Sequence, residues 1–227
     1  MKLAVVVPTL NEAEYLPRLL ESLERQTESA DEVIVSDGGS TDETAAIAKA
    51  AGASVVQGER GRGAQIASGI AATTSEVVLV LHADSRCDPR TVATVRRHFL
   101  ENPESVGGCL GHRFENGGIL LRLVEWADRR RGRQGISYGD QGQFFSREAL
   151  DRIGGYPRLP LMEDLEASRR LVAVGKPAYL DVPLISSTRG FERLGVLQTL
   201  WRNRRLRKAF LRSGLGAAEN LRRKYYS

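Results

Sequence analysis

The sequence predicts an α/β fold in which helices cover both faces of a mostly parallel central sheet, an α/β/α sandwich. The first hundred residues alternate between short apolar runs rich in β-branched residues and longer segments with helical periodicity. The apolar runs are continuous, as expected for strands buried on both faces. The 227 residues are 41% hydrophobic and 27% charged, which is ordinary for a globular protein with one large α/β domain or two small ones.

The first half contains four expected strands, each followed by an expected helix. The strands cover residues 3–7, 32–35, 54–57 and 77–81, and the helices cover residues 16–23, 43–51, 64–72 and 90–100. Asn11 and Glu14 have the spacing of a capping box before the first helix. Strands and helices that alternate in this way predict right-handed βαβ units and a parallel sheet.

The second half is less regular. We expect an extended segment at residues 106–115, helices at 120–131, 147–153 and 163–174, and strands at 143–146 and 178–182. Residues 194–225 are expected to be mostly helical, with an interruption near residues 214–216. We therefore divide the chain into a domain of residues 1–190 and a basic helical C-terminal extension of residues 191–227, which packs on or flanks that domain.

Charge and cysteine usage narrow the functional classes. The net charge is +5, and basic residues cluster at 129–133 and 201–224, a pattern that attracts phosphates, anionic lipid or nucleic acid, or that forms a solvated helix face. Aromatic content of 6% argues against a stacking platform for single-stranded nucleic acid. Two cysteines without a CxxC motif fit a reducing compartment. With no signal-peptide pattern and no long apolar stretch, we expect a cytoplasmic protein.

Polar loops follow three of the expected strands, at residues 8–12, 37–42 and 82–85. The carboxyl ends of parallel strands meet at one edge of the sheet, where ligands bind in open α/β folds. Asp84 can hold a divalent cation on a phosphorylated ligand, or it can cap the next helix. Asp37 can accept hydrogen bonds from a base or ribose, or it can belong to a tight turn.

Further motifs lie outside these loops. Gly61-Arg62-Gly63 at a helix start suits a phosphate, through backbone N–H groups and an arginine fork. Acids at Glu163 and Asp164 open a helix, where they favour the helix dipole, or Asp164 serves as a general base. The polar loop of residues 138–142 can shape an acceptor site. For His98 and His112 we expect no functional role, since neither has a nearby partner in sequence.

These motifs, in this order and spacing, resemble the GT-A-fold glycosyltransferases of family 2. The resemblance covers about residues 2–185 and rests on five motifs: Pro8-Thr9-Leu10-Asn11-Glu12, Asp37-Gly38-Gly39-Ser40-Thr41-Asp42, Gly61-Arg62-Gly63, the strand into His82-Ala83-Asp84, and Glu163-Asp164. Within the family the chain is similar to a short bacterial branch associated with radical-SAM gene neighbourhoods and arsenosugar biosynthesis.

The resemblance implies a GT-A (Rossmann-like) fold and an inverting transfer from a UDP- or GDP-linked sugar to a small-molecule or lipid-linked hydroxyl acceptor, assisted by Mn²⁺ or Mg²⁺. The residues implied to bind the nucleotide sugar are Pro8, Thr9, Leu10, Glu12, Asp37, Gly38, Arg62, His82, Ala83 and Asp84. Asp84 and His82 are the implied metal ligands, and Asp164, with Glu163 beside it, is the implied base. The family motif is usually Asp-x-Asp, and His82 replaces its first acid; imidazole suits Mn²⁺ better than Mg²⁺.

Two other function classes stay open. A nucleotidyltransferase of similar fold requires a glycine-rich, basic loop after the first strand, whereas residues 8–12 contain neither glycine nor a basic residue. A non-catalytic basic module that binds nucleic acid or membrane accounts for the tail but not for the acids at the strand ends. The tail itself can lie on a membrane surface near a lipid acceptor, form a homodimer or cover the site. We expect no nucleic-acid partner.

Overall fold

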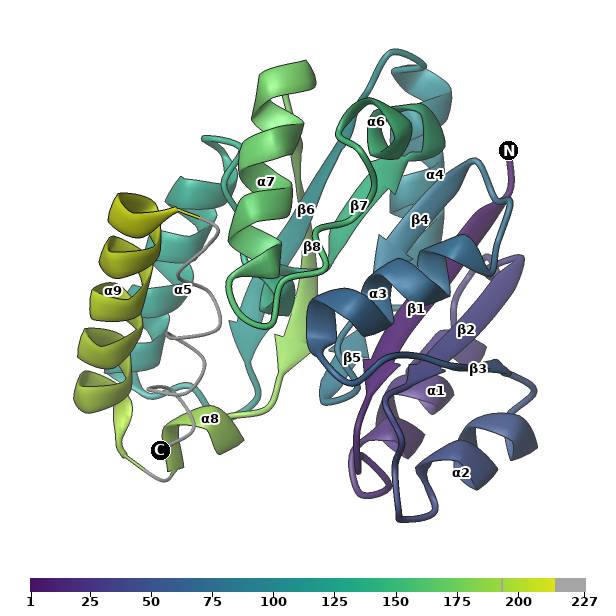
Figure 1. Cartoon of the computed structure of the whole chain (residues 1–227), viewed down its shortest axis with the longest axis horizontal. Helices are drawn as coiled ribbons and strands as arrows, with labels where there is room; N and C mark the ends of the chain where they lie inside the picture. Colours follow the sequence, from purple (N-terminus) through teal and green to yellow (C-terminus); the bar gives the residue numbers. More distant parts are fainter. Residues whose placement is uncertain (193, 215–227) are drawn as a thin grey trace.

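The computed structural model describes residues 1–192 and 194–214, and within this part of the chain the central feature is a sheet of eight strands (Figure 1). The strands are β1 (Leu3–Thr9), β2 (Glu32–Asp37), β3 (Ser54–Gln57), β4 (Val77–Val80), β5 (Ser85–Cys87), β6 (Gly107–Phe114), β7 (Gln143–Ser146) and β8 (Ala178–Ser186). Their spatial order is β3-β2-β1-β4-β7-β6-β8-β5.

Strand direction determines which loops share an edge of the sheet. β1, β2, β3 and β4 are mutually parallel, whereas β7 runs antiparallel to β4 and β6 runs antiparallel to β7. β6 therefore points the same way as β4, and β8 pairs parallel with β6. The carboxyl ends of β1, β2, β4, β6 and β8 and the amino end of β7 consequently lie along one edge. The predicted mostly parallel α/β sheet is confirmed.

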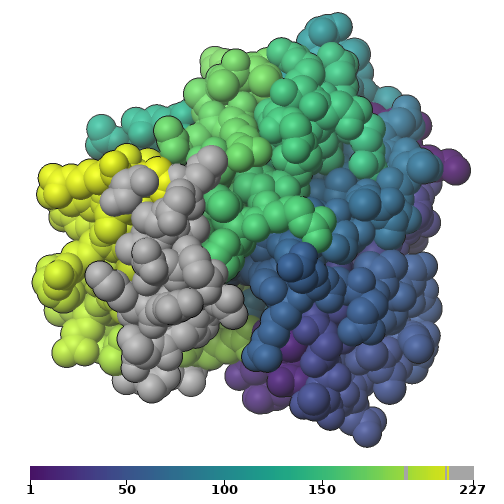
Figure 2. Space-filling model, in the orientation of Figure 1, coloured from purple at the N-terminus to yellow at the C-terminus, as the bar shows by residue number. Residues whose placement is uncertain are grey.

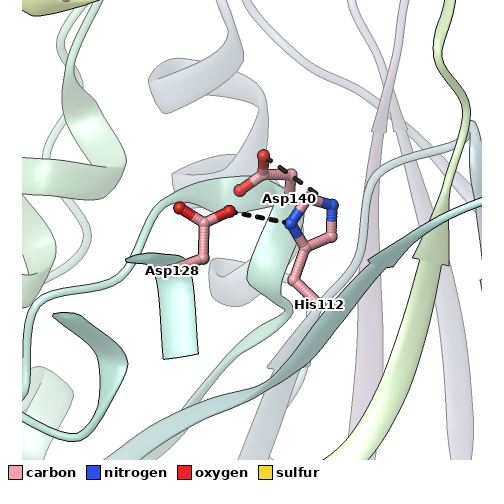
Figure 3. Close-up of side chains that lie close together, drawn as sticks. All are labelled: His112, Asp128 and Asp140. Atoms are coloured by element: carbon pink, nitrogen blue, oxygen red, sulfur yellow. Dashed lines mark hydrogen bonds and ion pairs between the residues drawn. The ribbon is translucent and has the colours of Figure 1, made fainter. Parts of the chain in front are cut away.

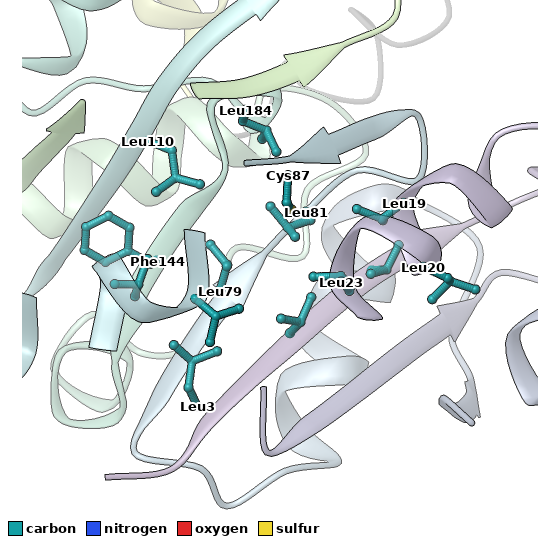
Figure 4. Packing of buried hydrophobic residues seen from close by; sticks show 14 of the residues in the cluster. Leu3, Leu19, Leu20, Leu23, Leu79, Leu81, Cys87, Leu110, Phe144 and Leu184 are labelled. Carbon is teal, nitrogen blue, oxygen red and sulfur yellow. The ribbon is translucent and has the colours of Figure 1, made fainter. Parts of the chain in front are cut away.

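Helices cover both faces of the sheet. On one face lie α1 (Leu16–Glu24), α2 (Thr44–Ala50) and α4 (Thr91–Glu101), and on the other lie α3 (Arg62–Ala71), α6 (Arg147–Arg152) and α7 (Glu163–Val174). Alternation along β1 sends Leu3, Val5 and Val7 to the first face and Val6 to the second. Figure 4 shows the first face, where leucines of α1 pack near Leu3 of β1 and Leu79 of β4.

Three helices complete the second half. α5 (Ile119–Gly132) packs beside β6, α8 (Arg189–Glu192) follows β8, and α9 (Val196–Ser213) contacts α8. Leu206 and Phe210 of α9 are buried with Leu161 and Leu165 at the start of α7. α9 accounts for part of the predicted basic extension, and residues 215–227 lie outside the described residues. Among the described helices, none has the length and apolarity needed to cross a membrane.

The predicted capping box before α1 is wrong. Tyr15 is the N-cap residue, and no side chain caps the helix. Asn11 instead adopts a left-handed conformation (φ 56°), and its Oδ1 accepts a hydrogen bond from the Thr41 backbone N–H at 2.9 Å. The side chain thus joins the loop after β1 to the loop after β2, and it is not available to the helix.

The two halves of the chain meet closely at Gly63. A Cβ at this position would lie 2.6 Å from the Leu159 carbonyl oxygen and 2.8 Å from the Leu159 nitrogen, so a larger residue displaces backbone. In Figure 2 the green segment around residue 160 lies directly against the blue surface of α3. This contact holds the amino end of α3 next to the amino end of α7, where the predicted Arg62, Glu163 and Asp164 are found.

Candidate active site

Asp37, at the end of β2, is fixed by the ends of two neighbouring strands. Its Oδ1 accepts a hydrogen bond from Thr9 Oγ1 at 3.2 Å, and its Oδ2 accepts from the backbone N–H groups of Gly39 at 3.1 Å and Ser40 at 2.9 Å. A Cβ on Gly38 would lie 2.8 Å from Gln65 Nε2. The Gln65 side chain of α3 therefore packs against Gly38, and the Asp37 carboxylate beside it is buried and held by its hydrogen bonds.

The loops after β1 and β4 are joined by an arginine that the sequence analysis missed. Arg189 donates two hydrogen bonds of 2.8 Å to the Glu12 carboxylate and one of 2.9 Å to Asp84 Oδ2. Its guanidinium also lies over the Tyr15 ring, 4.3 Å from the centroid. Burial disfavours its charge, but the hydrogen bonds to Glu12 and the charge of Asp84 outweigh burial and raise the pKa of Arg189.

His82 follows β4 and lies against the backbone of Gly139. A Cβ on Gly139 would lie 2.5 Å from His82 Nε2 and 3.5 Å from Asp164 Oδ2, so the imidazole and this carboxylate flank the same glycine. His82 Nε2 is buried without a hydrogen-bond partner among the described residues. Burial, followed by the positive charge of Arg62, lowers the pKa of His82 to about 3. The ring is therefore neutral at physiological pH, and a ring nitrogen is free to act as a ligand.

Asp164 and Glu163 open α7 but have different surroundings. Asp164 Oδ2 accepts a hydrogen bond of 2.8 Å from the Gly139 N–H, and its Oδ1 accepts one of 2.6 Å from the Leu165 N–H. Glu163 is fully buried and forms an ion pair with Arg62. Burial raises the pKa of Glu163, while Arg62 opposes that shift. Asp164 thus lies beside His82, whereas Glu163 anchors Arg62.

A second cluster that the sequence analysis missed lies farther along the same edge (Figure 3). His112 of β6 has its Nδ1 3.0 Å from Asp128 Oδ2 of α5, and its Nε2 lies 4.0 Å from Asp140 Oδ2. Asp140 belongs to the 3₁₀ helix η1 (Gly139–Gln141). One ligand atom from each of the three side chains lies within 4.8 Å of the others, a spacing compatible with a metal ion.

The three side chains of this cluster change one another's pKa values. Burial disfavours a charged imidazole, but the carboxylates of Asp140 and Asp128 outweigh it and raise the pKa of His112. Burial also raises the pKa of Asp140. For Asp128 burial acts in the same direction, but the hydrogen bond from His112 and the charge of Arg131 outweigh it and lower the pKa. Asp140 adjoins Gly139, the residue that His82 and Asp164 both flank, so the cluster borders the proposed base.

The structure brings most of the predicted residues to one edge, in two groups. Thr9, Asp37 and Gly38 form one end, with Pro8 and Leu10 beside them in the chain. Glu12 and Asp84 are joined by Arg189, and Ala83 is buried between His82 and Asp84 in sequence. Arg62 lies with Glu163 and not with the strand-end carboxylates.

Comparisons with known proteins agree with this architecture. The sequence profile of Glycosyl transferase family 2 matches residues 4–153. An uncharacterized glycosyltransferase of Mycobacterium tuberculosis is 38% identical over 182 residues, which cover 74% of this chain and 81% of the relative. An uncharacterized glycosyltransferase of Nostoc is 32% identical over 119 residues, and the match covers 49% of this chain but only 36% of that longer relative.

Solved structures share the fold. TarS 1–349 of S. aureus in complex with UDP-GlcNAc superposes with a TM-score of 0.66 at 20% identity, covering 83% of this chain and 59% of TarS. Glucosyl-3-phosphoglycerate synthase of Mycobacterium tuberculosis, in complex with Mn²⁺, UDP and glucosyl-3-phosphoglycerate, gives 0.62 at 24% identity, covering 95% of this chain and 80% of the synthase. The fold is that of GT-A glycosyltransferases, and with the profile match over most of its length this chain belongs to glycosyltransferase family 2.

Proposed function

We propose that the protein is an inverting glycosyltransferase that moves a sugar from a nucleotide-diphosphate donor, UDP-linked or GDP-linked, to a hydroxyl acceptor with the help of Mn²⁺ or Mg²⁺. The observation that carries the proposal is that Asp37 and Asp84 lie at strand ends on one edge of a GT-A sheet, where Asp164 and His82 flank Gly139 just before β7. Solved relatives of this fold bind UDP, UDP-GlcNAc and Mn²⁺, which supports the choice of donor and cation. Family membership favours sugar transfer over nucleotidyl transfer.

The nucleoside is proposed to bind at the end of β1 and β2. Asp37 is the proposed acceptor for base or ribose, and because Thr9, Gly39 and Ser40 already donate to its carboxylate, one of these donors must give way to the ligand. Gly38 beside it is a proposed contact for the ligand on the side that Gln65 does not cover. Pro8, Thr9, Leu10 and Glu12 line the same loop. Arg62, at the amino end of α3, is positioned by its ion pair with Glu163. Its guanidinium is a further proposed contact for the nucleotide-sugar donor.

The cation is proposed to bind Asp84, with His82 as the second ligand. The unpartnered, buried Nε2 of a neutral His82 fits this role, because a metal ligand must present a free lone pair. A bound cation neutralises the charge that builds on the leaving diphosphate. Asp84 is paired with Arg189, so this arginine must move aside or share the carboxylate when the cation binds.

Asp164 is the proposed base. The incoming acceptor hydroxyl attacks the anomeric carbon, the bond from that carbon to the diphosphate breaks, and the hydroxyl proton passes to a carboxylate oxygen of Asp164. Hydrogen bonds from the Gly139 and Leu165 N–H groups hold this carboxylate in place while each oxygen keeps a second lone pair for the proton. Such a positioned base contributes about 10²- to 10⁴-fold to the rate.

The base is tested by Asp164→Asn, with Asp151→Asn on the exposed surface of α6 as the control. We expect Asp164→Asn to lower kcat by at least about 100-fold while the donor Kd, measured by calorimetry, changes by less than about threefold. Asp151→Asn should leave both unchanged. Loss of donor binding in Asp164→Asn, or wild-type turnover, would contradict the assignment.

The donor and cation are tested by a thermal-shift screen of UDP-, GDP-, ADP- and dTDP-sugars with and without Mn²⁺, since a ligand of the native state raises its stability by mass action. The best donor is then titrated into Asp84→Ala. The control is Asp88→Ala, a nearby acid whose side chain contacts Arg90. We expect Mn²⁺ to tighten donor binding in the wild type and in Asp88→Ala but not in Asp84→Ala; equal stimulation in all three would refute the role of Asp84.

We also propose that the enzyme makes peripheral contact with anionic membrane through α5 and α9. Large apolar side chains on both helices are exposed, among them Ile119, Leu123, Trp126, Leu197 and Trp201. Arginines stack on both tryptophans, 5.9 Å from the ring centroid on α5 and 4.4 Å on α9. Apolar side chains with flanking cations are typical of helices that lie at a lipid surface.

Sedimentation with vesicles of neutral or mixed neutral and anionic lipid tests this contact. We expect binding that requires the anionic lipid and is weakened in Trp126→Ser/Trp201→Ser, and unchanged sedimentation of that variant would contradict it. We also propose that the chain belongs to the arsenosugar-associated branch and that its acceptor is lipid-linked. A cytoplasmic location and a homodimer are further proposals. The division at residue 190 also remains a proposal.

A further inference from the structure

His112 is buried, yet its Nε2 has no hydrogen-bond partner among the described residues. The residue is 6% exposed, its Nδ1 is engaged by Asp128, and Nε2 points toward Asp140 across 4.0 Å, beyond hydrogen-bond distance. Asp140 Oδ1 is likewise buried and unpartnered within the described chain. Unpaired buried groups of this kind are costly unless a ligand or water satisfies them.

Asp128 acts as a support for this arrangement. One of its carboxylate oxygens faces His112 Nδ1 at 3.0 Å, and the other accepts a hydrogen bond of 2.6 Å from Arg131. A carboxylate on Nδ1 selects the tautomer with its proton on that nitrogen and fixes the plane of the ring. His112 Nε2 is therefore held in one direction, toward Asp140.

The location ties the pair to the active site. His112 lies near the carboxyl end of β6 and Asp140 just before β7, both at the edge that contains Asp84. The backbone N–H of Gly139, the residue before Asp140, donates to Asp164. The Asp140 side chain is 40% exposed whereas the His112 side chain is fully buried, so the pair meets solvent only at Asp140.

We propose that His112 and Asp140 form a subsite for a hydroxyl group of the carbohydrate, positioned by Asp128 and Arg131. The 4.0 Å separation matches two atoms bridged by one hydroxyl oxygen about 2.8 Å from each, and because His112 Nε2 is buried, the partly exposed Asp140 side chain must turn outward to admit that oxygen. The hydroxyl donates to Asp140, and its oxygen interacts with His112 Nε2–H when the ring is protonated. This inference rests on the proposed function, and it adds the recognition of a sugar-type hydroxyl, on the donor or on the acceptor.

A metal ion is the competing occupant, and the surroundings disfavour it. Arg131 forms an ion pair with Asp128, and both oxygens of that carboxylate already have partners. The cluster then offers a cation two ligand atoms, from His112 and Asp140. Two protein ligands suffice for a divalent cation where a substrate diphosphate supplies the others, which is the role proposed for Asp84 and His82 and not for this cluster.

Calorimetry on the full-length protein tests the subsite with two probes, UDP and the UDP-sugar that gives the largest thermal shift. The variants are Asp140→Asn and His112→Gln, and the control is His98→Gln, a histidine whose Nε2 contacts Ser105 Oγ at 2.8 Å near the amino end of β6. For a donor hydroxyl we expect the UDP-sugar Kd to rise about tenfold in both site variants while the UDP Kd stays within about twofold, since a hydrogen bond to a charged group contributes on this scale.

A second arm separates the donor from the acceptor. Free hexoses are added to the UDP-saturated protein, and the imidazole signal of His112 is followed by NMR. A shift that is absent in Asp140→Asn, with an unchanged UDP-sugar Kd, assigns the subsite to the acceptor. The hexose arm is repeated without UDP, so that it still decides the matter if the wild type binds no nucleotide and the proposed function fails.

Three results overturn the inference. The first is an unchanged UDP-sugar Kd in both site variants together with no hexose-dependent shift of His112. The second is a change of equal size in His98→Gln. The third is Mn²⁺ binding, measured without nucleotide, that is lost in Asp140→Asn and retained in Asp84→Ala, because the cluster is then a metal site. Folding is checked by circular dichroism, and His112→Gln is the second variant if Asp140→Asn does not fold.

Discussion

Gly139→Ala probes the contact between the strand-end histidine and the proposed base. The added Cβ would lie 2.5 Å from His82 Nε2 and 2.6 Å from Cε1, whereas ordinary contacts are about 3.5–4 Å. The ring must therefore retreat by about 1 Å from a buried position next to Asp164. Overpacking of this kind costs about 1–3 kcal/mol of unfolding free energy.

Urea denaturation followed by circular dichroism measures this loss. With a slope of about 2–3 kcal/mol per molar urea, we expect the midpoint to fall by about 0.5–1 M. Gly118→Ala is the matched control, because nothing lies within 4 Å of a Cβ at that position. The same displacement should weaken Mn²⁺-dependent donor binding.

A double variant decides whether the clash with His82 is the cause. Removal of the ring in His82→Ala should make the additional Gly139→Ala substitution nearly neutral, which gives a coupling energy of about 1 kcal/mol or more. The reasoning is refuted if Gly139→Ala matches the wild type within about 0.5 kcal/mol, or if its effect is the same with and without the His82 ring.

Three further outcomes concern buried titratable groups. Burial raises the pKa of Cys87 and Cys109 to about 12, so neither thiol should react with a thiol reagent in the native protein at about pH 8; rapid native labelling would contradict this. Burial, followed by the charge of Arg62, lowers the pKa of His82 to about 3. The unfolded chain takes up a proton below about pH 6.5 that the folded protein does not bind, so the contribution to stability is complete above that pH and is lost as pH falls toward 3. His82→Gln should reduce the loss of unfolding free energy between about pH 7 and pH 5 by about 2 kcal/mol, and an unchanged pH dependence in urea titrations would argue against the shift. Arg62→Ala leaves Glu163 buried without its counter-charge, so it should destabilise the protein by about 1 kcal/mol more than Glu163→Gln; equal denaturation midpoints would show that the pairing has no such effect.

The buried strands and the loops after them could be predicted because their signals are local. Continuous apolar runs such as residues 77–81 identify a strand buried on both faces, and the polar residues that follow mark its end. β5 was missed because Ser85–Cys87 is too short to show a period. β8 continues past residue 182 through Pro183, a residue that lacks an N–H and is typical of strand ends, and it pairs there with β6 across a register shift.

The missed site residues depend on contacts between distant segments. Arg189 reaches the site because β8 extends to Ser186, and it then contacts Glu12 across 177 positions of the chain. His112 contacts Asp128 and Asp140, which lie 16 and 28 residues further on in α5 and η1, so no periodicity within a single element relates the three. Such partners follow from the sheet order, which the sequence alone did not provide.

The ion pairs of Arg189 have a consequence for how ligands compete at this edge. Arg189 already neutralises the Asp84 carboxylate, so a cation that binds Asp84 must compete with this guanidinium. The apparent affinity of the cation for Asp84 is therefore lower when a larger fraction of molecules has the Arg189–Asp84 ion pair formed. The coupling is reciprocal: occupation of Asp84 weakens the attachment of α8, to which Arg189 belongs, by the same free energy. α8 is thereby linked thermodynamically to the occupancy of the proposed donor site.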